Sequence, residues 1–458
     1  MWLEGAIVFT LTVYAFESYL DYRQYRNLCD EKPPSILIEA IEDVELKKKI
    51  AAKFQDSQAY GRAKARFGAF KRFVDEVLEA VLLLVYFGPW VWELTEDIAK
   101  DYFASSDVLV RSLLWIGIQH YLFLPLSIPF QYYQQFVIEE QFGFNKMTLR
   151  LFLTDFLKTE LLTIVIGAPL MVLTLKVIEW GGEYFYLYVR LCSALFTHSL
   201  THSLTHSLQH IQVFFTIFIF TIIMIYIFPT FIQPLFNEVV PLEEGELRKE
   251  IENLASSLKF PLTQLFKIDG SKRSHHSNAY MYGFWKNKRI VLFDTLISQT
   301  TTKEIVAVLA HELGHWAMSH TIQGLVISQC VSFSLFYTYG MVKDNQDMYS
   351  SFGYENFDST STIPHAIGIS LFLTTLWKPV NQLLQFLLTL NTRKNEFQAD
   401  AYAVNLGYGS KLTSALVKLQ IENLSNMNPD SLYSAYHYSH PPLVERLRAI
   451  RVGMKKAA

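Results

Sequence analysis

Long apolar runs separated by polar connections dominate the pattern of this chain. They lie near residues 3–20, 77–94, 108–128, 153–178, 321–342 and 364–390, with a further one somewhere within 184–233, where the length would allow two crossings but the charge pattern of the connections allows one. About 20 mostly apolar residues are needed for a helix to cross a bilayer, so each run is long enough for one crossing. The first run has neither a basic leading segment nor a small-residue cleavage site, which favours a retained span over a removed signal peptide. The pattern predicts an α-helical integral membrane protein with about seven transmembrane helices.

The polar connections alternate between segments that are rich in Lys and Arg and segments that hold almost none. Residues 21–72 carry twelve Lys or Arg residues and residues 234–320 carry ten, whereas 95–107 and 343–363 carry one each. Lys and Arg are kept on the cytoplasmic side of a membrane. Seven crossings therefore place the N-terminus in the lumen and the C-terminus in the cytosol.

Composition supports the membrane assignment and excludes other classes of protein. Hydrophobic residues make up 51% of the 458 residues and charged residues 18%, against about 25% charge in a typical soluble domain. This composition excludes a disordered chain, which needs low hydrophobicity and high net charge. The net charge of −3 argues against a nucleic-acid binder with a globally basic surface. The three cysteines are widely spaced and suggest neither a disulfide framework nor a thiolate metal site.

The motif with the clearest chemistry is His311-Glu312-Leu313-Gly314-His315. Apolar residues at 305, 306, 309 and 313 form a helical stripe around it. On a helix, His311 and His315 project from one face and can hold one zinc ion. Glu312 lies about 100° round the helix. Because zinc lowers the pKa of water, Glu312 is placed to remove and redeliver the proton as a general base.

A catalytic zinc needs a third protein ligand, and Glu396 is the candidate. It follows the last apolar run and is four residues from Asp400, so the two carboxylates share a helix face. One can bind the metal while the other accepts a hydrogen bond from a ligating imidazole and fixes its tautomer. By spacing alone, an acidic pair of this kind usually lies on a solvated helix face, and only the helix with the two histidines favours the metal interpretation.

A tandem Thr-His-Ser-Leu repeat places four histidines at positions 198, 202, 206 and 210. On a helix they form a slowly rotating stripe, so a metal stripe is one hypothesis. No other ligand type accompanies them, and the alternative is a short expanded repeat that lengthens a loop or a helix end.

The metal motif and the Glu396–Asp400 segment together resemble the type 1 CAAX prenyl proteases, which are integral-membrane zinc metallopeptidases. The resemblance extends along most of the chain, through blocks at 136–145, 271–284, 288–295 and 436–446 in the same order. It implies transmembrane helices that enclose a chamber and a mainly helical, zincin-like catalytic domain with a small β-hairpin.

The resemblance also implies roles for individual residues. His311, His315 and Glu396 match the zinc ligands, Glu312 matches the general base, and Asp400 matches a second acidic participant for which we favour support of a ligand. His440 and Arg446 match positions that steady the oxyanion or the substrate, and Asn278 matches the strand that aligns the substrate peptide. The cofactor implied is one zinc ion.

The residues themselves support these secondary roles only in part. Residues 277–284 alternate polar and aromatic side chains, and 285–288 can turn them into 289–293, which predicts a hairpin whose edge could bind an extended peptide by strand addition. Asn278 could instead cap a turn. His440 precedes two prolines and could be an ordinary helix-entry residue. Arg446 could pair with a nearby carboxylate or with water.

These expectations divide the chain into four parts. They are an N-terminal membrane domain with five spans, the first cytosolic catalytic part with the metal helix, the last two spans, and a C-terminal catalytic part with the third ligand. Their bounds are 1–236, 237–320, 321–390 and 391–458.

The activity that the resemblance implies is removal of the last three residues from prenylated CAAX proteins. A membrane site suits this chemistry because the isoprenoid partitions into the bilayer. Two alternatives stay open: a broader quality-control protease of membrane polypeptides, and a non-cleaving chamber protein that binds prenylated partners. The expected location is the endoplasmic reticulum membrane, or the inner nuclear membrane, and Lys455-Lys456-Ala457-Ala458 fits a cytosolic dilysine retrieval signal.

Overall fold

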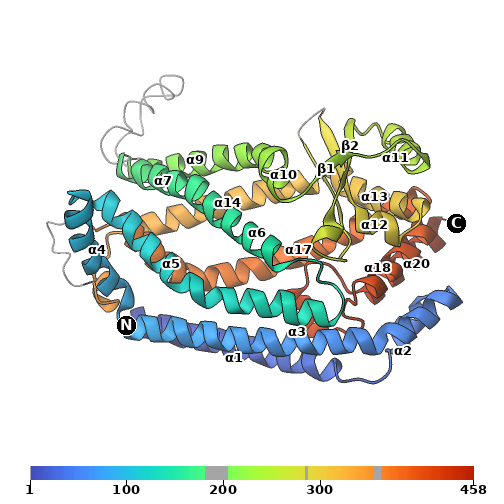
Figure 1. The fold of residues 1–458 in the computed structure, drawn as a ribbon, viewed down its shortest axis with the longest axis horizontal. Helices are drawn as coiled ribbons and strands as arrows, with labels where there is room; N and C mark the ends of the chain where they lie inside the picture. Colours follow the sequence, from blue (N-terminus) through green and yellow to red (C-terminus); the bar gives the residue numbers. More distant parts are fainter. Residues whose placement is uncertain (1, 181–204, 284–286, 355–362, 458) are drawn as a thin grey trace.

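The computed structural model describes residues 2–180, 205–283, 287–354 and 363–457. Long helices run along the long axis of the molecule, and a small sheet lies with the C-terminal helices at one end (Figure 1). The N-terminus lies at the opposite end. The histidine repeat at 197–210 falls outside the residues whose side chains are described, so the metal-stripe hypothesis stays a prediction.

The helices of the N-terminal half include three π-helical segments, labelled η1 to η3. In chain order these elements are α1 (Trp2–Asn27), α2 (Ser35–Ala40), α3 (Val44–Leu84), α4 (Phe87–Phe103), α5 (Val108–Tyr133), η1 (Gln134–Glu139), α6 (Leu149–Leu162), η2 (Thr163–Gly167), α7 (Ala168–Trp180), α9 (Thr205–Ile227), η3 (Phe228–Ile232) and α10 (Gln233–Phe236).

The C-terminal half combines four strands with further helices. In chain order they are β1 (Val239–Pro241), α11 (Glu246–Ser257), β2 (Leu262–Ile268), the 3₁₀ turn η4 (Gly270–Lys272), β3 (Ala279–Tyr282), β4 (Lys288–Phe293), α12 (Asp294–Gln299), α13 (Thr302–Ala317), α14 (His320–Val342), α15 (Gln346–Ser351), α16 (His365–Thr374), α17 (Trp377–Asn405), α18 (Gly409–Glu422), α19 (Ser431–His437) and α20 (Leu443–Ala457).

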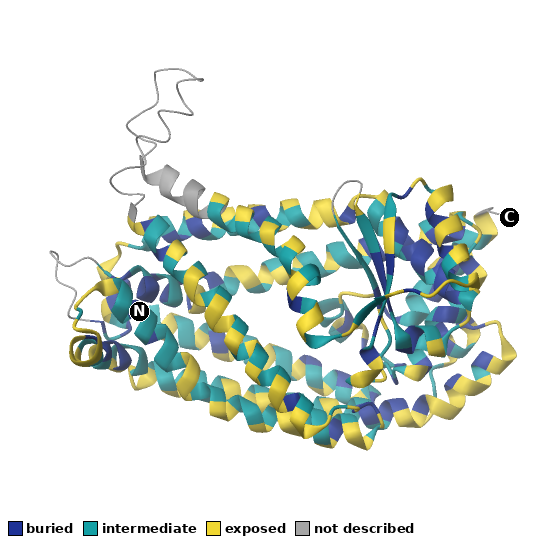
Figure 2. Ribbon diagram, turned by 45° about the horizontal axis from the view of Figure 1, so that its top comes forward, coloured by how far each residue is buried: buried dark blue, intermediate teal, exposed yellow. Residues whose placement is uncertain are grey.

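Several helices are long and apolar enough to cross a membrane. Within the described ranges there are four of them: Val108–Glu139, Leu149–Glu179, Phe215–Phe236 and His320–Val342. The bent pair of α3 and α4 would make a fifth. Their most apolar stretches are only 6–11% buried by other parts of the chain, and exposed residues run along them in Figure 2. Such apolar faces fit lipid rather than water. The count of seven spans remains a prediction.

Two of the predicted runs are interrupted rather than continuous. The run at 77–94 breaks between α3 and α4, which are bent by 64°, and the run at 364–390 breaks between α16 and α17. Each break lies three to four residues before a proline, Pro89 or Pro379. Proline has no N–H to donate to the carbonyl four residues earlier, and its ring crowds that carbonyl, so the preceding turn opens.

The four strands form one sheet in the order β1-β2-β4-β3. The pair β2–β4 is parallel, while β1–β2 and β3–β4 are antiparallel. The predicted hairpin is therefore confirmed as β3 and β4, with Ala279 opposite Leu292 and Tyr282 opposite Arg289. β3 is an edge strand, because β4 is its neighbour on one side and the sheet ends on the other.

The largest core cluster joins this sheet to the helix that carries the metal motif. The predicted stripe on α13 is buried: Ile305, Leu309 and Leu313 are each 1% exposed and pack with Ile290 and Leu292 of β4. Burying one such side chain stabilises the fold by about 1.5–3 kcal/mol relative to leaving it in water. The core thus fixes which face of α13 points away from the sheet.

The start of α13 is held by a buried carboxylate. Thr301 and Glu304 form a capping box, and Glu304 also accepts hydrogen bonds from Ser414 and Lys418 of α18. A capping box satisfies N–H groups that the first helical turn leaves unpaired. Burial alone would raise the pKa of Glu304, but the hydrogen bonds from Lys418, Ser414 and Thr301 outweigh it and lower the pKa to about 2.

We expect Glu304→Gln to destabilise the protein at neutral pH and to matter less in acid. The pKa of Glu304 is lower in the folded state, so its contribution is complete above the ordinary value of 4.5 and is lost as the pH falls towards 2. Thermal unfolding of both proteins between pH 7 and pH 3 measures this. The gap in unfolding temperature should narrow with acid, and a constant gap would contradict the assignment. Glu250→Gln, at an exposed position of α11, is the control.

Candidate active site

Helix α13 brings the two histidines of the motif together. His311 and His315 lie one turn apart, with their Nε2 atoms 3.2 Å from each other and their rings nearly perpendicular. His311 is buried and His315 is partly buried. The placement predicted from the four-residue spacing is therefore confirmed.

Helix α17 adds the third donor of this cluster. Glu396 Oε1 lies 3.3 Å from His315 Nε2, and Oε2 lies 3.6 Å from His311 Nε2. The ligand atoms of all three residues lie within 4.8 Å of one another, so they could hold one metal ion. Gly314 permits this approach of α17 to α13, since a Cβ there would be 3.1 Å from Ala399 Cα.

The spacing of the three donors fits a zinc ion. Ligands about 2.0–2.1 Å from a tetrahedral zinc are about 3.3 Å apart, and the measured separations are 3.2, 3.3 and 3.6 Å. Glu396 Oε2 is buried and accepts no well-directed hydrogen bond, although His440 Nδ1 lies 2.8 Å away as a charge contact. Two imidazole nitrogens and a carboxylate are ligands that zinc accepts.

Asp400 contacts the Nδ1 atom of His311, and Arg446 in turn binds Asp400. Asp400 Oδ1 lies 2.9 Å from His311 Nδ1 and is 1% exposed. Arg446 of α20 donates two hydrogen bonds to the same carboxylate, from Nε to Oδ2 at 2.8 Å and from Nη2 to Oδ1 at 2.7 Å. His311 Nδ1–H therefore donates to Asp400, which leaves the Nε2 lone pair of His311 facing the cluster.

The carboxylates of Glu396 and Glu312 have pKa values that are shifted in opposite directions. Burial would raise the pKa of Glu396, but His315, His440, His311 and Arg446 outweigh it and lower that pKa, so Glu396 is an anion. Burial raises the pKa of Glu312, against the opposing charges of His311, His315 and Arg446. A charged ligand and a more basic carboxylate beside it suit metal binding and proton transfer respectively.

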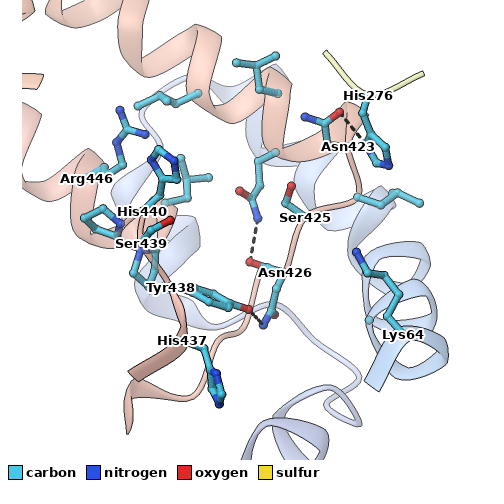
Figure 3. Close-up of a pocket in the computed structure, with 18 of the residues that line it drawn as sticks. Lys64, His276, Asn423, Ser425, Asn426, His437, Tyr438, Ser439, His440 and Arg446 are labelled. Carbon is cyan, nitrogen blue, oxygen red and sulfur yellow. Dashed lines mark hydrogen bonds between the residues drawn. The ribbon is translucent and has the colours of Figure 1, made fainter. Parts of the chain in front are cut away.

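A cavity of about 930 Å³ opens onto this cluster. Its lining includes His311, Glu312, Glu396, His440 and Arg446, together with parts of α1, α3 and α18. Figure 3 shows His440 and Arg446 beside one another on this wall, with Tyr438 and His437 further along the same segment. A volume of this size is typical of sites for small ligands and cofactors. His440 therefore borders the cavity beside Glu396, and its contact with the Glu396 carboxylate raises the pKa of its imidazole.

Asn278 also lines the cavity, at the start of the edge strand β3. Its backbone carbonyl accepts a hydrogen bond from Phe293 N–H, and its side-chain oxygen accepts one from Ala279 N–H. The side chain thus contacts the N–H of the next residue only, whereas a turn cap bonds to the backbone two residues on, and Asn278 borders the cavity. The neighbouring His276 stacks on Phe144 and lies 3.2 Å from Asn423 Oδ1 (Figure 3).

Sequence reasoning missed His320 and Gln398. His320 Nδ1 lies 3.0 Å from His315 Nδ1, and His320 Nε2 lies 3.0 Å from Gln398 Oε1. On an unbroken helix a residue five positions after His315 points about 140° away from it. A left-handed residue, Ser319 with φ 59°, ends that continuity and brings His320 back. The sequence carried no clear signal for this turn.

Two family models match the chain in succession. Residues 24–203 match the CAAX prenyl protease N-terminal model, described as five membrane helices, and residues 241–452 match peptidase family M48. Together with the cluster of two histidines and one glutamate and with the membrane-capable helices of the same chain, these matches define a membrane-embedded metallopeptidase.

Relatives cover nearly the whole chain. A CAAX prenyl protease 1 homolog of Oryza sativa is 42% identical, covering 98% of this chain and 97% of the relative, and CAAX prenyl protease 1 of Saccharomyces cerevisiae is 39% identical, covering 96% and 93%. The crystal structure of S. mikatae Ste24p superposes with a TM-score of 0.84 at 38% identity, covering 98% of this chain and 99% of that one. The chain belongs to the CAAX prenyl protease 1 family.

Proposed function

We propose that this chain is a zinc metalloendopeptidase that removes the C-terminal tripeptide from prenylated CAAX proteins at the cytosolic side of the membrane. The observation that carries the proposal is the cluster of His311, His315 and Glu396, which borders a cavity between the edge strand β3 and the long helices α1 and α3. The names of the relatives give the substrate class.

In this proposal His311, His315 and Glu396 bind zinc and Glu312 is the general base. When bound, zinc supplies Lewis-acid activation of water and of the scissile carbonyl. Glu312 takes the proton of the attacking water and delivers it to the leaving amine. Burial favours this role, because it raises the pKa of Glu312 and so makes it a better proton acceptor. Asp400 holds His311 in its ligating tautomer.

The substrate peptide is proposed to lie along β3. The free edge of this strand offers backbone groups for an added strand, and Asn278 at its start faces the same cavity as Glu312. His440 Nδ1 and Arg446 Nη1 lie 2.8 and 3.5 Å from Glu396 Oε2. Both are placed to stabilise the negative charge that develops on the carbonyl oxygen.

The proposal also covers the entry of the prenyl group, the bounds of the membrane and catalytic parts, and the location of the protein. The prenyl group enters from the bilayer, which the membrane-capable helices border. We propose the membrane domain at 1–236 and the last spans at 321–390, with the catalytic parts at 237–320 and 391–458 facing the cytosol. The proposed location is the endoplasmic reticulum membrane, with the inner nuclear membrane as a second site. No nucleic-acid partner is proposed.

Cleavage of matched peptides tests the function. Purified protein should cleave a farnesylated peptide ending in a CAAX sequence and leave intact the same peptide with serine in place of the prenylated cysteine. The lipid contributes binding energy that the unmodified peptide lacks. Equal cleavage of both peptides would favour the broader quality-control protease. Binding of the farnesylated peptide without cleavage, at full zinc occupancy, would favour the non-cleaving binder.

A further inference from the structure

The two histidines of the cluster are supported in different ways. The Nδ1 atom of His311 faces the carboxylate of Asp400. The Nδ1 atom of His315 faces a second imidazole, that of His320, at 3.0 Å. His320 is 8% exposed, and its other nitrogen lies 3.0 Å from the amide oxygen of Gln398. His315 is thus backed by a chain of two polar side chains, an imidazole and an amide.

Local structure explains how His320 reaches this position. Helix α13 ends at Ala317, where Met318 N–H still bonds to the Gly314 carbonyl. Ser319 then adopts a left-handed conformation, with φ 59° and ψ 28°, and α14 begins at His320. A left-handed residue turns the chain sharply away from the helix axis. The His320 ring consequently lies 5.1 Å from the ring of His315.

The hydrogen-bond chain has one self-consistent direction. The amide oxygen of Gln398 can only accept, so the proton of a neutral His320 lies on Nε2. The Nδ1 atom of His320 then carries a lone pair and accepts from His315 Nδ1–H. A neutral His315 with its proton on Nδ1 presents the Nε2 lone pair to His311 and Glu396. This is the tautomer that can bind a metal through Nε2.

We propose that His320, together with Gln398, is a positioning residue that fixes the metal-binding tautomer and orientation of His315. The inference rests on the proposed zinc site. A support without a carboxylate also suits the geometry, because Arg446 already contacts two carboxylates at this site, those of Glu396 at 3.5 Å and Asp400 at 2.7 Å. A further carboxylate behind His315 would add an anion that must be desolvated.

The test compares two replacements of His320 that separate hydrogen bonding from packing. His320→Asn keeps an oxygen near the position of Nδ1 and can accept from His315, but it is smaller. His320→Phe keeps the ring but cannot accept. Zinc affinity of the purified full-length protein is measured by competition with a chelator. We expect His320→Phe to lose about 10–100-fold in zinc affinity, the range for removed partners of ligating histidines, and His320→Asn to lose no more than about threefold.

The opposite order of the two variants would overturn the proposal, since a packing role favours phenylalanine over asparagine. Wild-type affinity in His320→Phe would overturn it as well. Gln323→Ala is the matched control, because Gln323 lies on the same helix as His320 and joins α14 to α17 by accepting a hydrogen bond from Asn395. Its zinc affinity should be unchanged.

Peptide cleavage and zinc content of the wild-type protein are measured in parallel. Absence of zinc in the wild type would refute the proposed function itself, together with this inference. Zinc in the wild type and unchanged affinity in His320→Phe would refute only the role of His320.

Discussion

Replacement of Glu312 by glutamine is expected to reduce cleavage of the farnesylated CAAX peptide by at least about a hundredfold, and by as much as ten-thousandfold. Glutamine is nearly the same size as glutamate but cannot accept and return a proton at neutral pH. The proposed ligands stay in place, because the cluster of metal donors is formed by His311, His315 and Glu396 without Glu312. We therefore expect about one zinc ion per chain in both proteins.

Activity and zinc content must be measured on the same preparations. The combination of lost activity and retained zinc separates a general base from a ligand. Loss of zinc in Glu312→Gln would mean that Glu312 binds the metal, and full activity would remove it from the mechanism. Glu250→Gln, at an exposed position on α11, controls for the loss of one negative charge and should leave both readouts unchanged.

Arg446→Met is expected to give the largest loss of stability, about 3–5 kcal/mol, the range for removing one partner of a buried ion pair. Arg446 holds both oxygens of Asp400, and the two side chains are 11% and 1% exposed. Without the guanidinium, the Asp400 carboxylate keeps its desolvation cost and loses its cation. Thermal unfolding in detergent measures the change.

Two further variants make this expectation specific. Adding Asp400→Asn to Arg446→Met removes the stranded charge while leaving an oxygen that can accept from His311, so the double variant should be more stable than Arg446→Met alone. Arg23→Met is the matched control: Arg23 also binds both oxygens of an aspartate, Asp430, but its side chain is 35% exposed. An equal loss of stability in Arg23→Met and Arg446→Met would contradict the dependence on burial.

Motifs with short spacing were predictable because they depend only on local helix geometry. A helix places residues four apart on one face, so His311 and His315 were expected to converge, and Glu396 and Asp400 to share a face. The structure confirms both, with a division of labour in which Glu396 faces the histidine Nε2 atoms and Asp400 faces Nδ1 of His311. The apolar stripe on α13 likewise indicated its buried side.

The helix breaks within two apolar runs have a cause in the sequence, a proline, but the hydrophobicity of the runs does not reveal them. Pro89 and Pro379 follow the interruptions of α3–α4 and α16–α17. Proline removes a backbone donor but leaves the average hydrophobicity of the run almost unchanged. A count of apolar residues therefore does not detect the helix break. Helices form within both of these runs, but neither run is one continuous helix.

The sequence by itself determined the class of protein, through its apolar runs and its resemblance to a family along most of the chain. It also determined the metal motif and the pairing of β3 with β4, since each of these two depends on periodicity within one short segment. Only the tertiary structure decided which distant groups meet. Arg446 reaches Asp400 because α20 packs on α17, and His320 supports His315 because one left-handed residue reverses the chain. Such contacts follow from packing of whole elements and from single backbone dihedrals, and the order of residues within one segment does not specify either.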